Sequence, residues 1–313
     1  MHPALSVIFL TTLIGAAQGL FLALFGVELG SSESFLLAHT QRFFVAGSVV
    51  ALLFSGLGLL ASFFHLGHPE RAWRSAAMWR TSWLSREVIA LPVFMLGVFL
   101  YGLSHLLGWG VSRWIGAVTL VACLALFVCT GMIYASIRFL QEWASPLTLV
   151  IYFLLGCASG LLLATLMASL AAMASHVQTF LVITMILTAV GWATRSASLV
   201  RNARLKPKST LQSAIGVKHP KIVQKAQGFM GGSFNTREFF HGRSTEMLRT
   251  VKWTFLILTF AVPLLLLAFG LKSPSTPLFL LAFTIQFVGL LAERWFFFAQ
   301  ANHPQNLYYQ NIS

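Results

Sequence analysis

The densest cluster of ionisable and polar side chains in this sequence lies between Phe63 and Val88, where one apolar segment ends and the next begins. His65 closes the first segment and Glu87 opens the second. A neutral imidazole and a carboxylate both accept protons, so the pair is suited to acid–base chemistry on a bound molecule. Ser82 and Arg86 stand beside Glu87 and add hydrogen-bonding groups to the same candidate site.

The elements that would position this cluster are membrane-spanning helices. Hydrophobic residues make up 57% of the chain and charged residues 9%, and the mean hydropathy is +0.79. Soluble domains carry roughly 25% charged residues, whereas a membrane span needs about 20 mostly apolar ones. The sequence therefore predicts an all-α polytopic bundle, a single domain over residues 1–313. Its eight predicted spans are 5–27, 40–64, 86–107, 114–139, 146–170, 176–200, 251–271 and 277–298.

The distribution of basic residues predicts the orientation of this bundle. Eight spans place both termini on one side of the membrane, and the loops on that side, together with Arg138 and Arg294, hold 18 of the 21 Lys and Arg residues. Loops rich in Lys and Arg remain in the cytoplasm. We therefore expect both termini in the cytoplasm.

The longest polar segment runs from about Arg201 to Arg249 and is strongly basic. A disordered linker lying on anionic lipid is one interpretation. Its aromatic residues favour a second interpretation, a loop that docks partner subunits, since aromatic side chains are enriched at protein interfaces. Phe229, Phe234 and Arg237 are candidate contacts in this loop, and His68, Arg71 and Arg74 are candidate contacts in the loop after the second span.

A membrane-soluble carrier of electrons and protons is the substrate that best suits His65 and Glu87. A quinol releases two protons with its two electrons, so its site needs hydrogen-bonding groups at both ring oxygens and an apolar slot for the tail. An ion pair at the membrane surface is the alternative role for Glu87 beside Arg86, and also for Glu293 beside Arg294. The histidines fall near span ends, so bis-histidine haem is not expected.

Two further patterns are interpreted as structural. The cysteines at 123, 129 and 157 lie in apolar runs without metal-ligand spacing, and we expect buried thiols. Gly15 and Gly19 form a GxxxG pattern, which predicts close packing of helices. A secondary transporter remains an alternative function for a chain of this class, but its usual inverted repeats and broken helices are not evident.

The stretch HLGHPERAW resembles the DmsC family of membrane anchor subunits. The residues that carry the resemblance are His65, Leu66, Gly67, Pro69, Arg71 and Ala72, the helix start at Ser85 to Glu87, and the late segment Gly289 to Arg294. The similarity extends over most of the chain, including the eight spans. The basic loop at 201–249 is longer than expected for a dimethyl sulfoxide reductase anchor.

This resemblance implies a complex of three subunits at the inner membrane of a bacterial cell. The family's anchors hold a molybdopterin catalytic subunit and a four-cluster iron–sulfur subunit, typically carry no haem, and exchange electrons with ubiquinone or menaquinone. The histidine of HLG-P and the glutamate opening the next helix are implicated in quinol binding, which carries over to His65 and Glu87. The chain itself would then be a subunit of a quinone-linked oxidoreductase with no substrate chemistry of its own, and no nucleic-acid partner is expected.

Orientation separates the branches of this family. A complex on the cytoplasmic face is similar to the membrane-bound sulfite dehydrogenases, which oxidise sulfite to sulfate and pass electrons to quinone. The opening MHPALSVIFLTTL also resembles the anchors of that branch. The alternative is an anchor of a dimethyl sulfoxide or polysulfide reductase, which would oxidise quinol instead.

Overall fold

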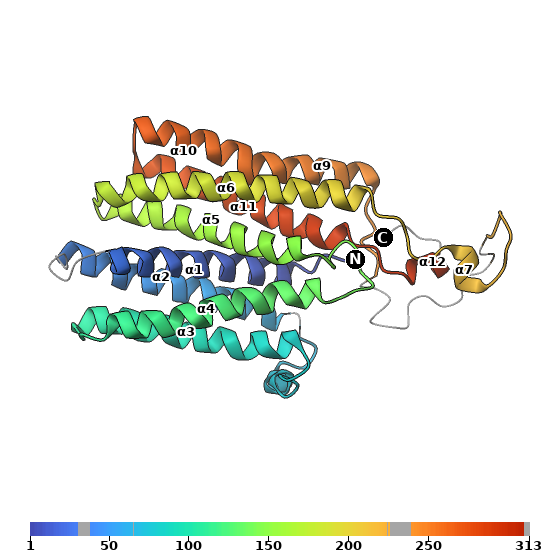
Figure 1. Ribbon diagram of the computed structural model, residues 1–313, viewed down its shortest axis with the longest axis horizontal. Coiled ribbons are helices and arrows are strands. Elements are labelled where there is room, and N and C mark those ends of the chain that lie inside the picture. Colours follow the sequence, from blue (N-terminus) through green and yellow to red (C-terminus); the bar gives the residue numbers. More distant parts are fainter. Residues whose placement is uncertain (31–37, 65, 224, 226–238, 310–313) are drawn as a thin grey trace.

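The computed structural model is a bundle of long helices, in which successive spans run antiparallel to one another (Figure 1). It describes residues 1–30, 38–64, 66–223, 225 and 239–309. Within these residues, eight helical segments are long and apolar enough to cross a membrane. They are α1 (Leu5–Gly30), α2 (Ala38–Phe63), α3 (Trp83–Leu107), α4 (Ser112–Ala135), α5 (Pro146–Leu170), α6 (Ala174–Ala203), the composite α9 to α10 (Thr245–Lys272) and α11 (Thr276–Ala299).

The all-α class and the eight predicted spans are confirmed, and only their ends differ. The structure extends most spans by a few residues, since hydropathy falls before the helical hydrogen bonds end. The seventh span is not one regular helix. It consists of α9 (Thr245–Leu256), the π-helical turn η3 (Ile257–Ala261) and α10 (Val262–Lys272).

Two glycine pairs set the centre of the bundle, where α1 crosses α5. A Cβ atom on Gly19 would lie 2.2 Å from the carbonyl oxygen of Gly156, and one on Gly160 would lie 2.2 Å from the backbone of Gly19. Only glycine allows backbones this close. The packing predicted from Gly15 and Gly19 is confirmed, and the sequence analysis missed that α5 carries the matching pair Gly156 and Gly160.

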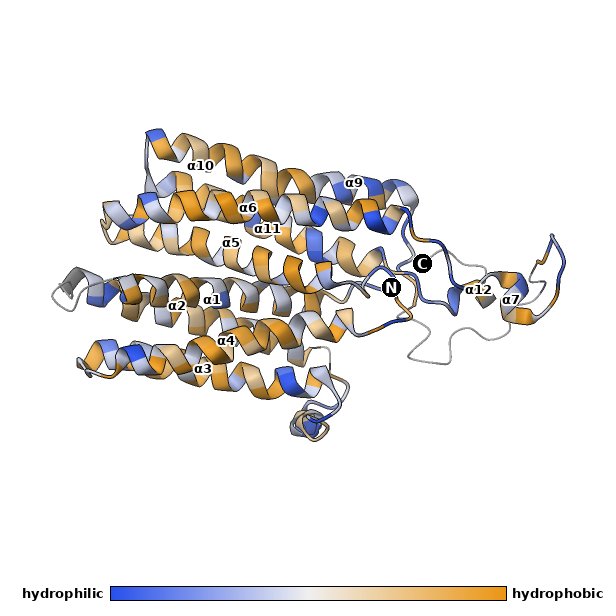
Figure 2. Cartoon of the chain, viewed as in Figure 1, coloured by the Kyte–Doolittle hydropathy of each residue, from blue (hydrophilic) through white to orange (hydrophobic). Residues whose placement is uncertain are grey.

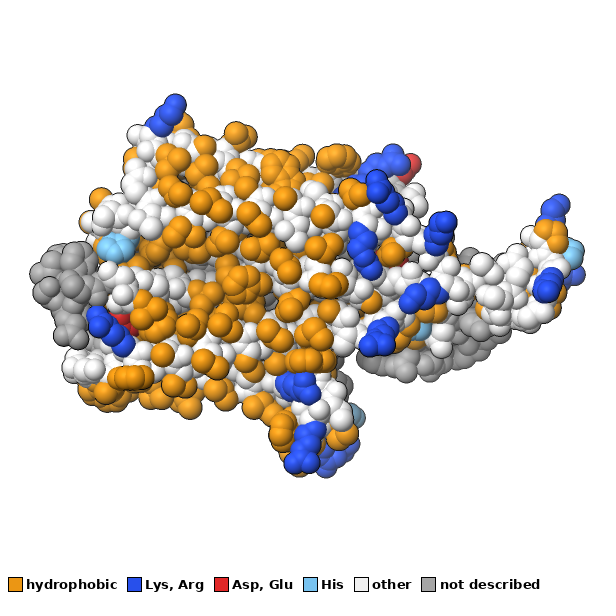
Figure 3. Space-filling view, in the orientation of Figure 1, with side chains coloured by type: hydrophobic (Ala, Val, Ile, Leu, Met, Phe, Trp, Pro, Cys, Tyr) orange, Lys and Arg blue, Asp and Glu red, His pale blue; other side chains and the backbone are white. Residues whose placement is uncertain are grey.

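The chain termini and the short segments lie at the same end of the bundle (Figure 1). The 3-10 helix η2 (Pro69–Ala76) connects α2 to α3, and α7 (Leu211–Ile215) and α12 (Asn306–Tyr309) lie beyond the other helices. Hydrophobic residues make up most of the long helices, and hydrophilic residues gather mainly toward their ends (Figure 2). We call the end with the termini the basic face, because most of the visible Lys and Arg residues lie there (Figure 3).

Two arginines that the sequence analysis assigns to this face are placed elsewhere by the structure. Arg195 lies inside α6 and Arg294 inside α11, and their side chains are 1% and 4% exposed. Both face protein rather than water, so neither is a signal of orientation. The remaining cations of the connecting loops still favour the basic face.

Candidate functional site

The side chain of Glu87 lies inside the bundle rather than at its surface. Ser82 caps the start of α3 by accepting a hydrogen bond from the amide of Ser85 at 3.4 Å, and Glu87 follows about one turn later. Glu87 is 8% exposed, and its Oε1 accepts a hydrogen bond from the hydroxyl of Thr130 on α4. Burying a carboxylate in this position is costly, and ionisable groups inside a membrane usually face a partner or a cavity and serve a function.

Arg86 does not pair with Glu87. Its Nε donates to the carbonyl of Trp79 at 2.9 Å and its Nη2 to that of Arg80 at 2.8 Å, while its guanidinium lies 4.2 Å from the ring centre of Trp83. Arg86 therefore fastens the loop to the start of α3. The alternative of a surface ion pair between Arg86 and Glu87 is wrong.

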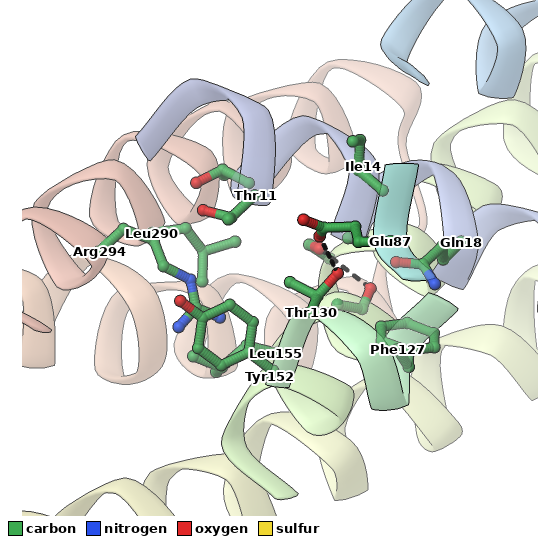
Figure 4. A pocket seen from close by; sticks show the side chains of 14 residues that line it. Thr11, Ile14, Gln18, Glu87, Phe127, Thr130, Tyr152, Leu155, Leu290 and Arg294 are labelled. Carbon is green, nitrogen blue, oxygen red and sulfur yellow. Dashed lines mark hydrogen bonds between the residues drawn. The ribbon is translucent and has the colours of Figure 1, made fainter. Parts of the chain in front are cut away.

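Glu87 faces a small pocket between five helices (Figure 4). Its volume is about 20 Å³, which is room for one water molecule and far below the several hundred Å³ of typical ligand pockets. Thr130 lies beside Glu87, while Tyr152 and Arg294 lie together across the pocket (Figure 4). Its lining consists of Thr11, Thr12, Ile14, Gly15, Gln18, Glu87, Phe127, Thr130, Tyr152, Leu155, Gly156, Ser159, Leu290 and Arg294.

Arg294 belongs to a buried ionic cluster. Its Nη1 lies 3.3 Å from Oε2 of Glu293, and the guanidinium lies 3.7 Å from the ring centre of Tyr152. The other oxygen of Glu293, Oε1, lies 2.7 Å from Nε of Arg195 on α6. The expected ion pair between Glu293 and Arg294 is therefore present, but its expected place at the membrane surface is wrong, because Glu293 is fully buried.

The ionic cluster and Glu87 lie at similar depth in the membrane. At 1.5 Å per helical residue, Glu87 is about 6 Å from the start of α3, Glu293 about 9 Å from the end of α11, and Arg195 about 12 Å from the end of α6. All three of these helix ends belong to the basic face. The bundle therefore contains two carboxylates and two guanidinium groups in one layer below that face.

A group of aromatic side chains packs between this layer and the loops of the basic face. Tyr134, Tyr152, Phe297 and Phe298 pack around Trp143, whose indole Nε1 donates to the carbonyl of Phe297 at 2.9 Å. The ring of Trp143 also stacks on that of Phe297, with centroids 5.3 Å apart. Trp143 lies in the loop between α4 and α5, so this aromatic group packs next to the pocket on the side of the basic face.

A second buried pair lies at the opposite end of the bundle. Oε1 of Glu28 on α1 lies 3.5 Å from Nε2 of His105 on α3 and accepts a hydrogen bond from Ser112. The imidazole stacks on Phe44 with centroids 4.2 Å apart. The rings of Phe21, Phe25, Phe94 and Tyr101 pack into one aromatic group next to this pair.

The extramembrane groups at the basic face form a cap over the helix ends. The amino group of Met1 donates to the carbonyl of Ala301 at 2.7 Å, and burial lowers its pKa to about 5. Burial, reinforced by the nearby amino terminus, lowers the pKa of His241 to about 4. His303 stacks on Phe239 with centroids 3.8 Å apart, and burial lowers its pKa as well.

The predicted site residues fare differently in the structure. Glu87 lines the pocket, whereas Ser82 and Arg86 do not. His65 lies outside the described residues, as do Phe229, Phe234 and Arg237. The three candidate docking residues around η2 are exposed, and His68 Nδ1 lies 3.0 Å from Oε1 of Glu70; they are His68, Arg71 and Arg74.

Sequence reasoning missed the other half of the pocket. Thr130 and Tyr152 look like ordinary residues of apolar spans, and the charge pattern groups Arg195 with the loop cations. The available signal was the pair Glu293 and Arg294 well inside an otherwise apolar segment, since intramembrane charges usually face a partner or a cavity. In the described residues, no group of three His, Cys, Asp or Glu side chains could hold a metal ion.

Comparison with known proteins agrees with this architecture. The family model described as DMSO reductase anchor subunit (DmsC) matches residues 1–309. The chain belongs to the DmsC family. It is also similar to a sulfite dehydrogenase subunit of Allochromatium vinosum, with 54% identity over 331 aligned positions that cover the whole of both chains. The eight spans of this DmsC-family chain are therefore those of a membrane anchor.

Proposed function

We propose that this chain is the membrane anchor and quinone-reactive subunit of a sulfite dehydrogenase complex. The identity to the sulfite dehydrogenase subunit supports the choice of complex. In it, a molybdopterin subunit oxidises sulfite to sulfate, and an iron–sulfur subunit passes the electrons to quinone at this anchor. The observation that carries the role in quinone chemistry is the buried Glu87, hydrogen-bonded to Thr130 about one helical turn inside the membrane.

Reduction of a quinone to a quinol adds two electrons and two protons, with one proton on each ring oxygen. Glu87 is suited to donate one of these protons, since a carboxyl group in a desolvated site can act as a general acid. The pocket behind Glu87 is too small for a quinone ring. We therefore place the ring against Glu87 from the side of the α2–α3 loop, with His65 as the proposed second hydrogen-bonding group.

The basic face is the proposed docking face for the partner subunits, and we propose that it lies in the cytoplasm. The loop around η2 presents exposed arginines and the exposed ring of Trp73 at this face. Electrons must travel only a short distance from a docked iron–sulfur cluster to a quinone beside Glu87, because Glu87 lies about 6 Å below the start of α3.

A second candidate is the anchor of a dimethyl sulfoxide reductase. The family description supports it, and the same residues would then accept protons from quinol instead of donating them. The site chemistry does not choose the direction, whereas the full-length identity to a sulfite dehydrogenase subunit favours sulfite oxidation.

The test is to purify the intact complex with Glu87→Gln and to compare two activities. Sulfite oxidation with a soluble dye reports the catalytic subunit, and sulfite-dependent quinone reduction reports the anchor. We expect the variant to keep the dye activity and to lose quinone reduction by about a hundredfold or more. Glu246→Gln, at the exposed start of α9, is the matched control.

Unchanged quinone reduction in the Glu87 variant would refute the assigned site. A complex that reduces sulfoxides with quinol, but does not oxidise sulfite, would support the second candidate.

A further inference from the structure

The pocket behind Glu87 has the size and the polar groups of a water site. About 20 Å³ admits one water molecule. Glu87 and Thr130 face it from one side, and Tyr152 and Arg294 face it from the other (Figure 4). The side chain of Tyr152 is buried and lines the pocket. A water molecule here would have the several polar partners that buried water requires.

The charges around this pocket balance only when Glu87 is ionised. Arg195, Arg294 and Glu293 together carry one net positive charge in the bundle interior. An ionised Glu87 makes the set neutral, and a protonated Glu87 leaves it with an uncompensated positive charge. Uncompensated charge is expensive in a low-dielectric interior, so the ionic cluster favours the state of Glu87 that follows proton donation.

From these two observations we infer that the pocket is a proton-delivery chamber, in which a bound water molecule reprotonates Glu87 and Arg294 is the fixed counter-charge. The inference rests on the proposed quinone reaction. Glu293 and Arg195 are positioning residues, because they act only through the guanidinium that they hold. Arg294 acts through Glu87 and does not contact the quinone.

The proton that Glu87 supplies, one of the two that the quinone takes up, has a defined donor and acceptor at each step. The carboxyl group of Glu87 transfers its proton to a ring oxygen of the quinone as electrons arrive from the iron–sulfur subunit. The resulting carboxylate takes a proton from the pocket water, which in turn receives one from the aqueous phase. Arg294 stabilises the carboxylate as its charge develops, and a charge fixed in advance is effective because it needs no reorganisation.

Other titratable groups near Glu87 come from three helices. Cys129 and Tyr134 of α4 and Tyr152 of α5 interact electrostatically with Glu87, and Arg86 lies next to it on α3. Among the described residues, α1 contributes no ionisable side chain to the pocket lining. Arg294 is therefore the only cation in that lining, and its removal is the perturbation that should move the pH dependence.

The experiment measures quinone-linked and dye-linked sulfite oxidation between pH 6 and 9 in the intact complex. Three variants are compared with the parent: Arg294→Gln removes the charge, Arg294→Lys retains it, and Tyr152→Phe removes only a hydroxyl group. Arg42→Gln, an exposed arginine at the opposite end of the bundle, is the matched control. The dye-linked rate reports whether each variant is folded and assembled.

We expect Arg294→Gln to lower quinone-linked turnover at neutral pH by about tenfold or more. The alkaline limb of the pH profile of quinone-linked turnover should move to higher pH in this variant, because Glu87 loses the cation that favours its ionised form. Arg294→Lys should keep the limb near that of the parent. Tyr152→Phe should lower turnover without moving the limb, since a neutral hydroxyl does not bias the charge of Glu87.

An Arg294→Gln complex with the parental rate and pH profile would overturn the inference. A Lys variant whose limb moves as far as that of the Gln variant would also overturn it. If the Arg294→Gln variant fails to assemble, the other two variants test the inference. A parental alkaline limb in Arg294→Lys together with a lower turnover in Tyr152→Phe supports it, and a shifted limb in Arg294→Lys or a parental turnover in Tyr152→Phe overturns it. A parent complex with dye-linked but no quinone-linked activity would instead refute the proposed function.

Discussion

Replacement of Gly160 by alanine should separate the two central helices of the bundle. The added Cβ would lie 2.2 Å from the carbonyl carbon and 2.2 Å from the next amide nitrogen at Gly19 and Leu20. Ordinary contact begins at about 3.4 Å, so α1 and α5 must move apart by roughly 1 Å. Backbone atoms cannot rotate away as a side chain can, and the strain has no local release.

The expected cost is at least about 3 kcal/mol, the upper part of the range for overpacking. The shift also disturbs the pocket, because Gly15, Gly156 and Ser159 line it from these two helices. The assay is the midpoint of thermal unfolding of the purified protein in detergent, together with the quinone-linked rate of the complex. Both should fall in the Gly160 variant.

Gly26→Ala is the matched control on α1, since nothing lies within 4 Å of its added Cβ. Alanine at this site should leave the midpoint unchanged or raise it, because alanine has the higher helix propensity by about 1 kcal/mol. Equal midpoints for the Gly160 and Gly26 variants would refute the packing argument.

Two more predictions concern the basic face. Burial lowers the pKa of His241 to about 4, from 6.5 in the unfolded chain. Below pH 6.5 the unfolded chain therefore binds a proton that the folded cap does not. The cap should lose about 1 kcal/mol of stability per pH unit as the pH falls from about 6.5 toward 4. Hydrogen exchange of residues 239–243 at pH 7 and pH 5 checks this, and equal protection at both values contradicts it. Trp143→Phe removes the hydrogen bond to Phe297 while retaining a stacked ring, and should cost about 1–3 kcal/mol by leaving a buried carbonyl unpaired; an unchanged unfolding midpoint contradicts this.

The sequence by itself determined the membrane class and the eight spans, and it singled out Glu87 as a candidate site residue. A helix that spans lipid must satisfy its backbone hydrogen bonds within itself, so each span is one continuous apolar segment. Such a segment can be recognised from the hydropathy of consecutive residues. The position of Glu87 at the start of an apolar segment was also visible in the chain. The resemblance at HLGHPERAW pointed to the family that the full-length match then showed.

Only the tertiary structure decided what surrounds Glu87. Thr130, Tyr152 and Arg294 come from three other helices and meet Glu87 because the glycine pairs bring α1 and α5 together. The structure also places Arg195, which the charge pattern groups with the loop cations, inside α6 as the partner of Glu293 on α11. The face of an apolar helix that meets a given neighbour depends on steric fit between the helices. The sequence does not indicate that face, because a uniformly apolar span has little amphipathic pattern.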